Sequence, residues 1–288
     1  MDLFQYDFMQ RALLGALVIG LTAPALGIYL VQRRLALIGD GIGHVALTGV
    51  GAGLLLNRSP VLVAVVAAIL GAVTIELVRA RGRTSGDLAL ALLFYGGIAG
   101  GVMLVGLSDA SSANLNAYLF GSLTTTSAAD LTTIAVLGVT IAVLMLALRP
   151  ALFAVCHDEE YARVAGLPVR ALNMVLAVAT AVTVTIAMRA VGVLLISALM
   201  VVPVATAQQV TRGFRSTMTA AMALGLFAAG AGVWVAATAD TAPGASVVLL
   251  AIASFLVVAL AAAAWRVLRR RSAPAVATTP EPHEVVLR

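Results

Sequence analysis

Two side chains that could bind a metal ion stand four residues apart in an apolar stretch of the chain. They are Asp40 and His44. In a helix, residues i and i+4 lie one above the other on the same face, so both side chains could reach one ion. A carboxylate oxygen and an imidazole nitrogen suit zinc, manganese or ferrous iron. Counted from Arg34, the helical rise predicts that the pair lies roughly 9 and 15 Å along its span, in the middle of a membrane.

An ionisable group inside a bilayer is costly, and this cost predicts a function for the pair. The alternative is that Asp40 and His44 hydrogen-bond each other or a neighbouring helix, which would satisfy both groups without an ion. Three neighbours, Gly39, Gly41 and Gly43, favour the first interpretation. They thin the helix around the pair and leave room for an ion or water.

Other polar residues in the apolar stretches give weaker evidence of a function. Glu76 stands close to Arg79 and is expected to form an interfacial ion pair with it, the alternative being a metal contact on the exit side. A later apolar stretch contains a polar run with a proline, and helix breaks within a membrane are tolerated only where protein or a cavity satisfies the backbone. The residues expected to line a pathway there are Ser197, Pro203, Thr206 and Gln208.

These side chains have to be positioned by helices that lie in a membrane. Of the 288 residues 61% are hydrophobic and 11% charged, and the mean hydropathy is +1.06. Soluble domains carry about 25% charged residues, so composition predicts an all-α integral membrane protein. We expect a transmembrane domain at residues 1–271 and a disordered cytoplasmic tail at residues 272–288. Cys156, the single cysteine, excludes an intrachain disulfide and a cysteine-rich metal cluster.

Apolar runs of about 20 residues predict a bundle of about nine transmembrane helices. The spans are placed at 12–31, 36–56, 60–78, 88–107, 130–148, 170–188, 190–210, 216–237 and 244–265. Eight spans remain an alternative, because the connection at Met188–Ala190 is very tight. A capping box of Ser127 and Asp130 is expected to open the fifth span. The glycine pairs Gly96/Gly100 and Gly97/Gly101 predict close packing between helices.

Every basic residue is an arginine, and the arginines fall between the apolar runs. With the N-terminus outside and the C-terminus in the cytoplasm, most of them lie on the inner side, as the positive-inside rule requires. This distribution accounts for the net charge of +5 without a nucleic-acid partner. The longest inner loop runs from His157 to Pro168 and contains an acidic run. There we expect a short helix ended by Gly166, whose acidic face is either plain solvated charge or a docking site for a partner.

The segment from Arg33 to Leu47 resembles the R-R-x-x-x-x-G-D-x-x-x-H-x-x-L segment of the zinc/manganese ABC transporter permeases, membrane subunits of the ABC-3 type. Later landmarks follow in the same order, and the resemblance covers about Tyr6 to Trp265. They are Tyr118–Ser122, Asp158 with Ala162 and Gly166, Met188–Leu195, Pro203–Ala207 and Pro243–Ala245. Two departures are Thr48, where many relatives carry proline, and Gly43, where serine or alanine is common.

The resemblance implies a permease that does no chemistry itself and carries a divalent metal ion, zinc before manganese or iron, across the bacterial plasma membrane. It implies a homodimeric pore, two cytoplasmic ABC ATPase subunits and an extracytoplasmic metal-binding protein, with no permanently bound cofactor. Asp40 and His44 match the family's metal-contacting pair. The residues that match its ATPase coupling loop are Asp158, Glu159, Glu160, Ala162 and Gly166.

Two other readings of the sequence stay open. In a proton-coupled secondary carrier, Asp40 and His44 would form a proton relay. In a non-transporting membrane scaffold they would be a buried hydrogen bond. The chain has no lysine and therefore no Walker A loop. If transport is driven by ATP, the ATPase is another polypeptide.

Overall fold

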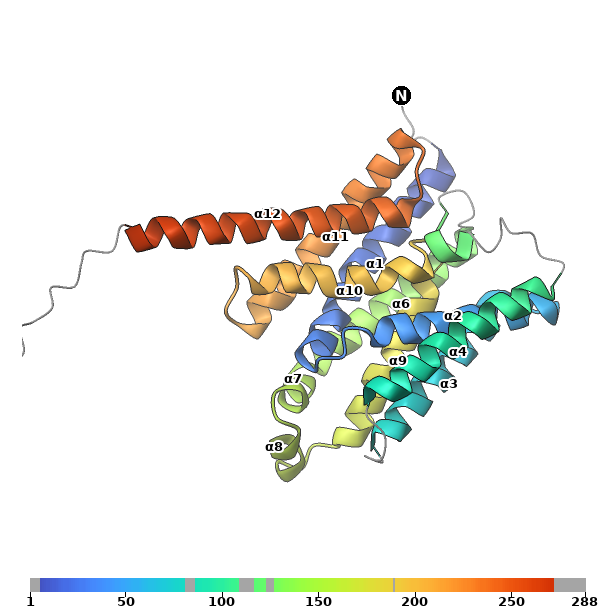
Figure 1. The fold of residues 1–288 in the computed structure, drawn as a ribbon, viewed down its shortest axis with the longest axis horizontal. Helices are drawn as coiled ribbons and strands as arrows, with labels where there is room; N and C mark the ends of the chain where they lie inside the picture. The colour runs from blue at the N-terminus through green and yellow to red at the C-terminus, as the bar shows by residue number, and fades with distance from the viewer. Residues whose placement is uncertain (1–5, 81–85, 109–116, 123–126, 189, 272–288) are drawn as a thin grey trace, which may run out of the picture.

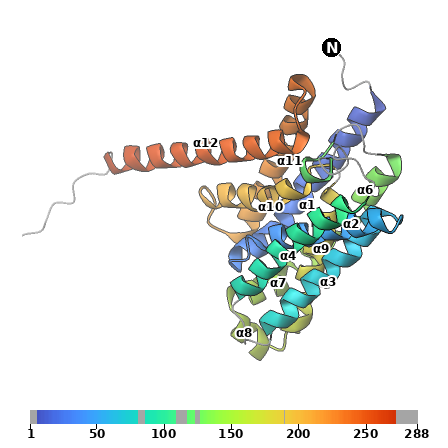
Figure 2. The same cartoon turned by 45° about the vertical axis from the view of Figure 1, so that its right-hand side comes forward.

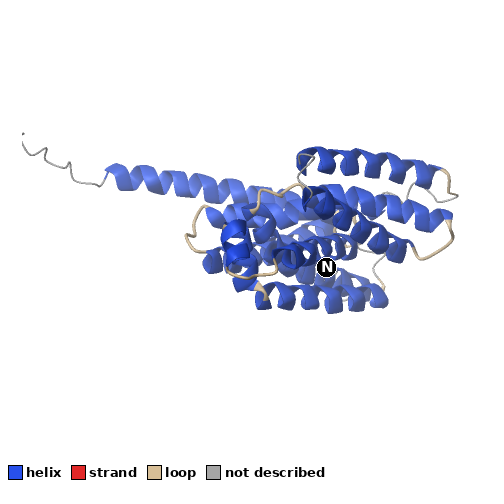
Figure 3. Ribbon diagram, turned by 90° about the horizontal axis from the view of Figure 1, so that it is seen from below, coloured by secondary structure: helices blue, strands red, loops and turns tan. Residues whose placement is uncertain are grey.

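The structure, a computed structural model, describes residues 6–80, 86–108, 117–122, 127–188 and 190–271. Its regular elements within these ranges are helices (Figures 1 and 3). They are α1 (Asp7–Gln32), α2 (Ile38–Leu55), α3 (Pro60–Ala80), α4 (Gly86–Gly106), α6 (Ala128–Ala147), α7 (Arg149–His157), α8 (Glu159–Val164), α9 (Val169–Ala187), α10 (Val193–Gln208), α11 (Phe214–Ala239) and α12 (Pro243–Arg271).

Each predicted span overlaps one of these helices, which confirms an all-helical chain with several apolar helices. Among the described residues, seven helices are long and apolar enough to cross a membrane. Two more, in α4 and α10, have shorter apolar segments, Leu90–Gly106 and Ile196–Gln208. The number of crossings and the orientation of the termini therefore stay predictions. The predicted tail at 272–288 lies outside the described residues.

The first helix runs through the middle of the bundle and packs against α6, α9, α10 and α11 (Figures 1 and 2). Its side chains from Ala23 to Leu30 are buried without a break. Close approach to α11 depends on two glycines, because a Cβ on Gly20 would lie 2.6 Å from the carbonyl oxygen of Gly225. The Tyr29 hydroxyl donates a 2.9 Å hydrogen bond to the Met145 carbonyl of α6. α1 is thus the element around which α6, α9, α10 and α11 are arranged.

The second helix packs between α3 and α4 and also contacts α10. The predicted glycine pairs behave differently from one another in this contact. Cβ atoms on Gly97 and Gly101 would press on α2, and one on Gly100 would contact Thr48, whereas one on Gly96 would meet nothing within 4 Å. α4 therefore presses the Gly97 side of its surface against α2 and leaves Gly96 on the open side.

Helix ends follow the local sequence closely. Ser127 and Asp130 form the predicted capping box, with hydrogen bonds of 3.0 and 3.1 Å. α8 is the predicted short helix, and it ends where the amide of Gly166, at φ +80°, donates to Arg163 and the amide of Leu167 donates to Ala162. α7 was not predicted. It starts where Pro150 occupies the first turn, a position at which proline costs no helical hydrogen bond.

Two glycine turns from distant parts of the chain meet backbone to backbone. Gly121 has φ +77° and Gly192 has φ +92°, a region that side chains rarely tolerate. A Cβ on Gly121 would lie 2.7 Å from the carbonyl oxygen of Ala190. The segment at residues 117–122 is therefore held directly against the connection between α9 and α10.

The last helix projects beyond the rest of the bundle (Figures 1 and 2). Leu249, Leu256 and Leu260 are exposed along it. In water such an apolar surface would be unfavourable, whereas lipid or another apolar partner covers it without cost. This exposure agrees with a multi-pass membrane protein.

Cysteine labelling tests the predicted orientation. The thiol of Cys156, outside the candidate spans, lies 3.8 Å from the Tyr29 carbonyl, and burial raises its pKa to about 11. At neutral pH it stays protonated and unreactive, so it gives a low background. Leu56→Cys and Val164→Cys would replace side chains that are 65% and 88% exposed. We expect a membrane-impermeant maleimide to label Leu56→Cys in intact spheroplasts, but Val164→Cys only after lysis. The opposite pattern would invert the topology.

A matched pair of glycine variants tests the contact between α2 and α4. A Cβ on Gly97 would lie 2.6 Å from the backbone carbonyl carbon of His44, whereas Gly96 faces open space. We expect Gly97→Ala to lower the free energy of unfolding by about 1–3 kcal/mol, the usual cost of overpacking. Gly96→Ala should leave it unchanged. Thermal unfolding midpoints in detergent measure both, and equal midpoints would contradict this packing.

Candidate metal site

The two predicted metal ligands lie near the beginning of α2. This helix starts at Ile38, so Asp40 and His44 are about 3 and 9 Å from its first residue along the axis, not the predicted 9 and 15 Å. The reason is the connection before it. The amide of Leu35 bonds the Leu30 carbonyl at 2.8 Å, which ends α1 in a tight turn rather than starting the next helix early.

Neither ligand is satisfied by the rest of the chain. Asp40 is half-buried and makes no hydrogen bond or ion pair with the described residues. His44 is 7% exposed, and its Nδ1 atom is buried without a hydrogen-bond partner. Buried polar atoms are nearly always paired, and an exception calls for an explanation. Among the described residues, the two side chains form no hydrogen bond with each other or with a neighbouring helix, as the alternative interpretation would require.

One wall of the site is formed by α4. The ring of Phe94 stands edge-on to that of His44, with the centroids 4.4 Å apart and the planes at 78°. Gly97 brings α4 this close, and the Thr48 hydroxyl holds it there by donating a 2.7 Å hydrogen bond to the Gly97 carbonyl. Thr48, one of the two departures from the family pattern, thus fastens α4 beside the site.

A cavity of about 370 Å³ opens between α2 and α4. Its lining combines the Asp40 carboxylate with apolar and aromatic side chains, of which Tyr95 is 70% exposed. The residues that line it are Leu37, Asp40, Leu90, Ala91, Phe94 and Tyr95. The carboxylate therefore faces the outer surface of this chain rather than a sealed interior.

The other wall is formed by α10, which brings one of the predicted pathway residues to the site. The Ser197 hydroxyl is buried and has no hydrogen-bond partner. It lies 2.8 Å from the position that a Cβ on Gly39 would occupy. Since Gly39 directly precedes Asp40, a second unsatisfied polar group lies beside the same turn of α2.

The remaining pathway candidates follow farther along α10. α10 continues through Pro203 from Val193 to Gln208, within the single span predicted at 190–210. Proline removes a single backbone hydrogen bond, and packing against α1, α2, α11 and α12 holds the helix together around it. Thr206 is buried and donates to the Val202 carbonyl at 2.7 Å, while Gln208 is exposed.

One copy of the chain supplies only two metal donors at this place. Among the described residues there is no group of three or more histidine, cysteine, aspartate or glutamate side chains that could hold an ion. Zinc usually takes four ligands. The pair alone would therefore form only part of a coordination shell.

The predicted coupling residues lie on α8 and its two ends. Asp158 caps the helix by accepting a 2.9 Å hydrogen bond from the Tyr161 amide. Ala162 is fully buried and packs α8 onto the core, and Gly166 ends the helix. Glu160 is exposed. In Figure 1, α7 and α8 lie together at one end of the bundle.

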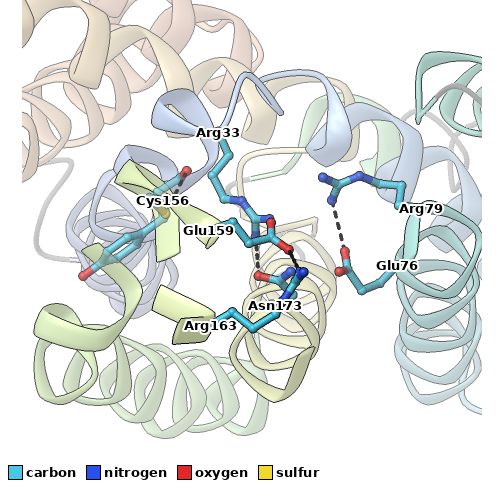
Figure 4. A network of polar contacts seen from close by, with 8 residues as sticks. Arg33, Glu76, Arg79, Cys156, Glu159, Arg163 and Asn173 are labelled. Atoms are coloured by element: carbon cyan, nitrogen blue, oxygen red, sulfur yellow. Dashed lines mark hydrogen bonds and ion pairs between the residues drawn. The ribbon is translucent and has the colours of Figure 1, made fainter. Parts of the chain in front are cut away.

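A network of charged groups joins α8 to the membrane helices (Figure 4). Glu159 pairs with Arg33 at the end of α1 at 3.1 Å, and Arg33 also donates to Asn173 of α9 at 2.6 Å. The predicted pair of Glu76 and Arg79 is confirmed at 3.0 Å. The sequence analysis did not identify Arg33 and Asn173 as partners. Asn173 is the single asparagine in the apolar span 170–188, and an isolated amide there could have indicated a polar partner.

Known proteins with similar sequences and folds agree with this architecture. A model of the ABC 3 transport family matches residues 5–262. The manganese transport system membrane protein MntC of Halalkalibacterium halodurans is 29% identical over 255 residues, which are 88% of this chain and 87% of that protein. The high-affinity zinc uptake system membrane protein ZnuB of Haemophilus influenzae is 29% identical over 244 residues, covering 85% and 94%.

A solved structure supports the same assignment. PsaBC from Streptococcus pneumoniae in complex with Fab is similar with a TM-score of 0.78 and 30% identity, over 89% of this chain and 92% of that one. The family model spans nearly all of the helices described above. The chain therefore belongs to the ABC 3 transport family and is a multi-pass membrane permease, not an enzyme.

Proposed function

We propose that this chain is the permease subunit of an ATP-driven importer of divalent transition-metal ions, with zinc as the favoured ion. The observation that carries the proposal is the pair on α2. Asp40 and His44 stand one turn apart, and neither is hydrogen-bonded within the described part of the chain. A dication would offset the cost of such a pair in an apolar bundle.

Two donors per chain are compatible with transport. A site that binds its ion too strongly cannot release it, so conduction requires moderate affinity. Water or donors from another chain would complete the shell. The neighbouring Ser197 hydroxyl, unsatisfied and close to Gly39, is the first pathway residue we assign on α10, with Pro203, Thr206 and Gln208 following toward its end.

A second copy of the chain is the partner that fits the open side of the site. A carboxylate that faced lipid would be costly, yet Asp40 lines a cavity that opens on the surface of α2 and α4. Tyr95 lines this opening, and Leu92, Tyr95 and Met103 of α4 are each 66–70% exposed. A two-fold axis there would cover these side chains and bring two Asp40/His44 pairs together around one pathway.

The energy source has to come from other polypeptides. We assign α8 as the docking element for a cytoplasmic ATPase, since it exposes Glu160, Tyr161 and Val164 while Ala162 anchors it. Mixed apolar and acidic side chains on a protruding helix are suited to a protein interface. ATP binding and hydrolysis would move α8 and expose the metal site alternately to the two sides. An extracytoplasmic metal-binding protein would deliver the ion.

Membership of an ABC transport family favours this mechanism over a proton-coupled carrier or a scaffold. The choice of metal rests on chemistry, because relatives are named for manganese and for zinc. Imidazole suits zinc and iron, whereas manganese is usually held by oxygen ligands. His44 thus favours zinc or iron over manganese, and of these two we favour zinc.

Substitution of the ligands tests the site. We expect Asp40→Asn and His44→Gln each to reduce uptake of radioactive zinc by about tenfold or more, which corresponds to about 1.4 kcal/mol of lost interaction. Copurification of the ATPase would check that the complex assembles. The matched control is Asp240→Asn, an exposed aspartate at the end of α11 where asparagine keeps the left-handed backbone. Full uptake by an assembled Asp40→Asn complex would remove the metal site.

Competition tests the metal. In proteoliposomes that contain the complete transporter with its binding protein, unlabelled zinc should inhibit uptake of radioactive zinc at a lower concentration than manganese or ferrous iron. The imidazole nitrogen is the reason for this order. Manganese as the strongest competitor would reassign the transported ion and leave the rest of the proposal in place.

A further inference from the structure

Arg33 is a buried cation whose position depends on two other helices. It directly follows the last residue of α1, Gln32, and its side chain is 8% exposed. The guanidinium donates to Asn173 Oδ1 of α9 at 2.6 Å and to Glu159 Oε2 of α8 at 3.1 Å (Figure 4). Glu159 is 41% exposed, but it supplies the one carboxylate that the buried guanidinium contacts among the described residues, so its loss would leave the charge of Arg33 uncompensated. A movement of Glu159 is therefore expected to displace the guanidinium as well.

Glu159 in turn belongs to α8. Its other oxygen accepts a 3.2 Å hydrogen bond from Arg163, one turn along the same helix. This pair fixes the carboxylate to α8, so a displacement of α8 displaces it. A cavity of about 810 Å³, lined by Arg33, Glu159 and Arg163 on one side and by Glu76 and Arg79 on the other, separates this part of α8 from α3. On that side α8 has room to move.

The connection from Arg33 to the proposed metal site is short and is closed by several backbone hydrogen bonds. Arg34 adopts φ +58°, and its amide bonds the Val31 carbonyl at 3.1 Å. The amide of Ile38 then bonds Leu35 at 3.0 Å, and that of Gly41 bonds Leu37 at 3.2 Å. These hydrogen bonds restrict the backbone of the turn. A displacement of Arg33 is therefore expected to displace the first turn of α2, which carries Asp40.

We propose that Arg33 is a positioning residue that links the ATPase-docking helix to the metal site, through Glu159 on one side and the α1–α2 turn on the other. This inference rests on the proposed function of α8 and of Asp40. Allostery needs a contact through which one site biases the other, and the Arg33–Glu159 pair is such a contact. Arg33 touches no ion itself.

The test compares Arg33→Gln with Arg79→Gln in the purified complex of permease, ATPase and binding protein in proteoliposomes. Arg79 lines the same cavity but pairs with Glu76 on its own helix, so its loss removes the same charge without cutting the link. For Arg33→Gln we expect basal ATP hydrolysis and zinc binding to be retained, while the ATP hydrolysed per transported ion rises by about tenfold. Arg79→Gln should keep the wild-type ratio.

A charge exchange separates a link from a merely structural role. Arg33→Glu combined with Glu159→Arg should restore much of the coupling, since the pair is rebuilt with reversed polarity. If Arg33→Gln fails to assemble, Glu159→Gln replaces it, with the same expected rise. A wild-type ratio in either assembled single variant, or an equal rise in Arg79→Gln, overturns the inference alone. A wild-type complex that transports no metal overturns it together with the proposed function.

Discussion

Two ionisable side chains without partners determine how the helices around α2 are arranged. Among the described residues, Asp40 and His44 leave a half-buried carboxylate and a buried ring nitrogen without hydrogen-bond partners, and α10 adds the Ser197 hydroxyl beside them. α4 reaches the same place only because Gly97 has no side chain. An apolar bundle tolerates such a concentration of unmet hydrogen-bonding capacity only where something else supplies the missing interactions. A passing cation and a second chain together would do so.

The polar network at the end of α1 is the opposite case. The Arg33 side chain is as buried as His44, but Asn173 and Glu159 supply acceptors for it. A satisfied buried cluster holds helices in fixed relative positions, whereas an unsatisfied one can take a ligand. The described residues thus contain a satisfied polar cluster and an unsatisfied one, and a single tight turn separates them.

Local sequence signals predicted much of this structure. The apolar runs gave the approximate bounds of the helices, the spacing of Ser127 and Asp130 gave a cap, and Gly166 gave the end of α8. Each depends on residues within a few positions of one another. The late start of α2 escaped prediction because the turn that delays it is closed by backbone hydrogen bonds that any residue can make. How α10 stays continuous through Pro203 could not be read from the sequence for another reason, since its packing against α1, α2, α9, α11 and α12 holds it together.

At the candidate site, too, local features were predicted from the sequence and contacts between distant segments were not. The identity and spacing of Asp40 and His44 could be read directly, as could the pair of Glu76 and Arg79 one turn apart. The partners of Arg33 lie on α8 and α9, far along the chain, and no local pattern links them. Which glycine face of α4 contacts α2 also depends on tertiary packing, because Gly96 and Gly97 are equivalent in the sequence. Contacts between distant segments are what a single sequence leaves undetermined.

The backbone contact between Gly121 and the connection from α9 to α10 limits how the bundle can move. No side chain lies between the two segments, so no flexible atoms are available to absorb a shear. Residues 117–122 and the α9–α10 connection are therefore expected to move together as one rigid unit. A transport cycle that widens this end of the bundle has to bend the chain on either side of that unit.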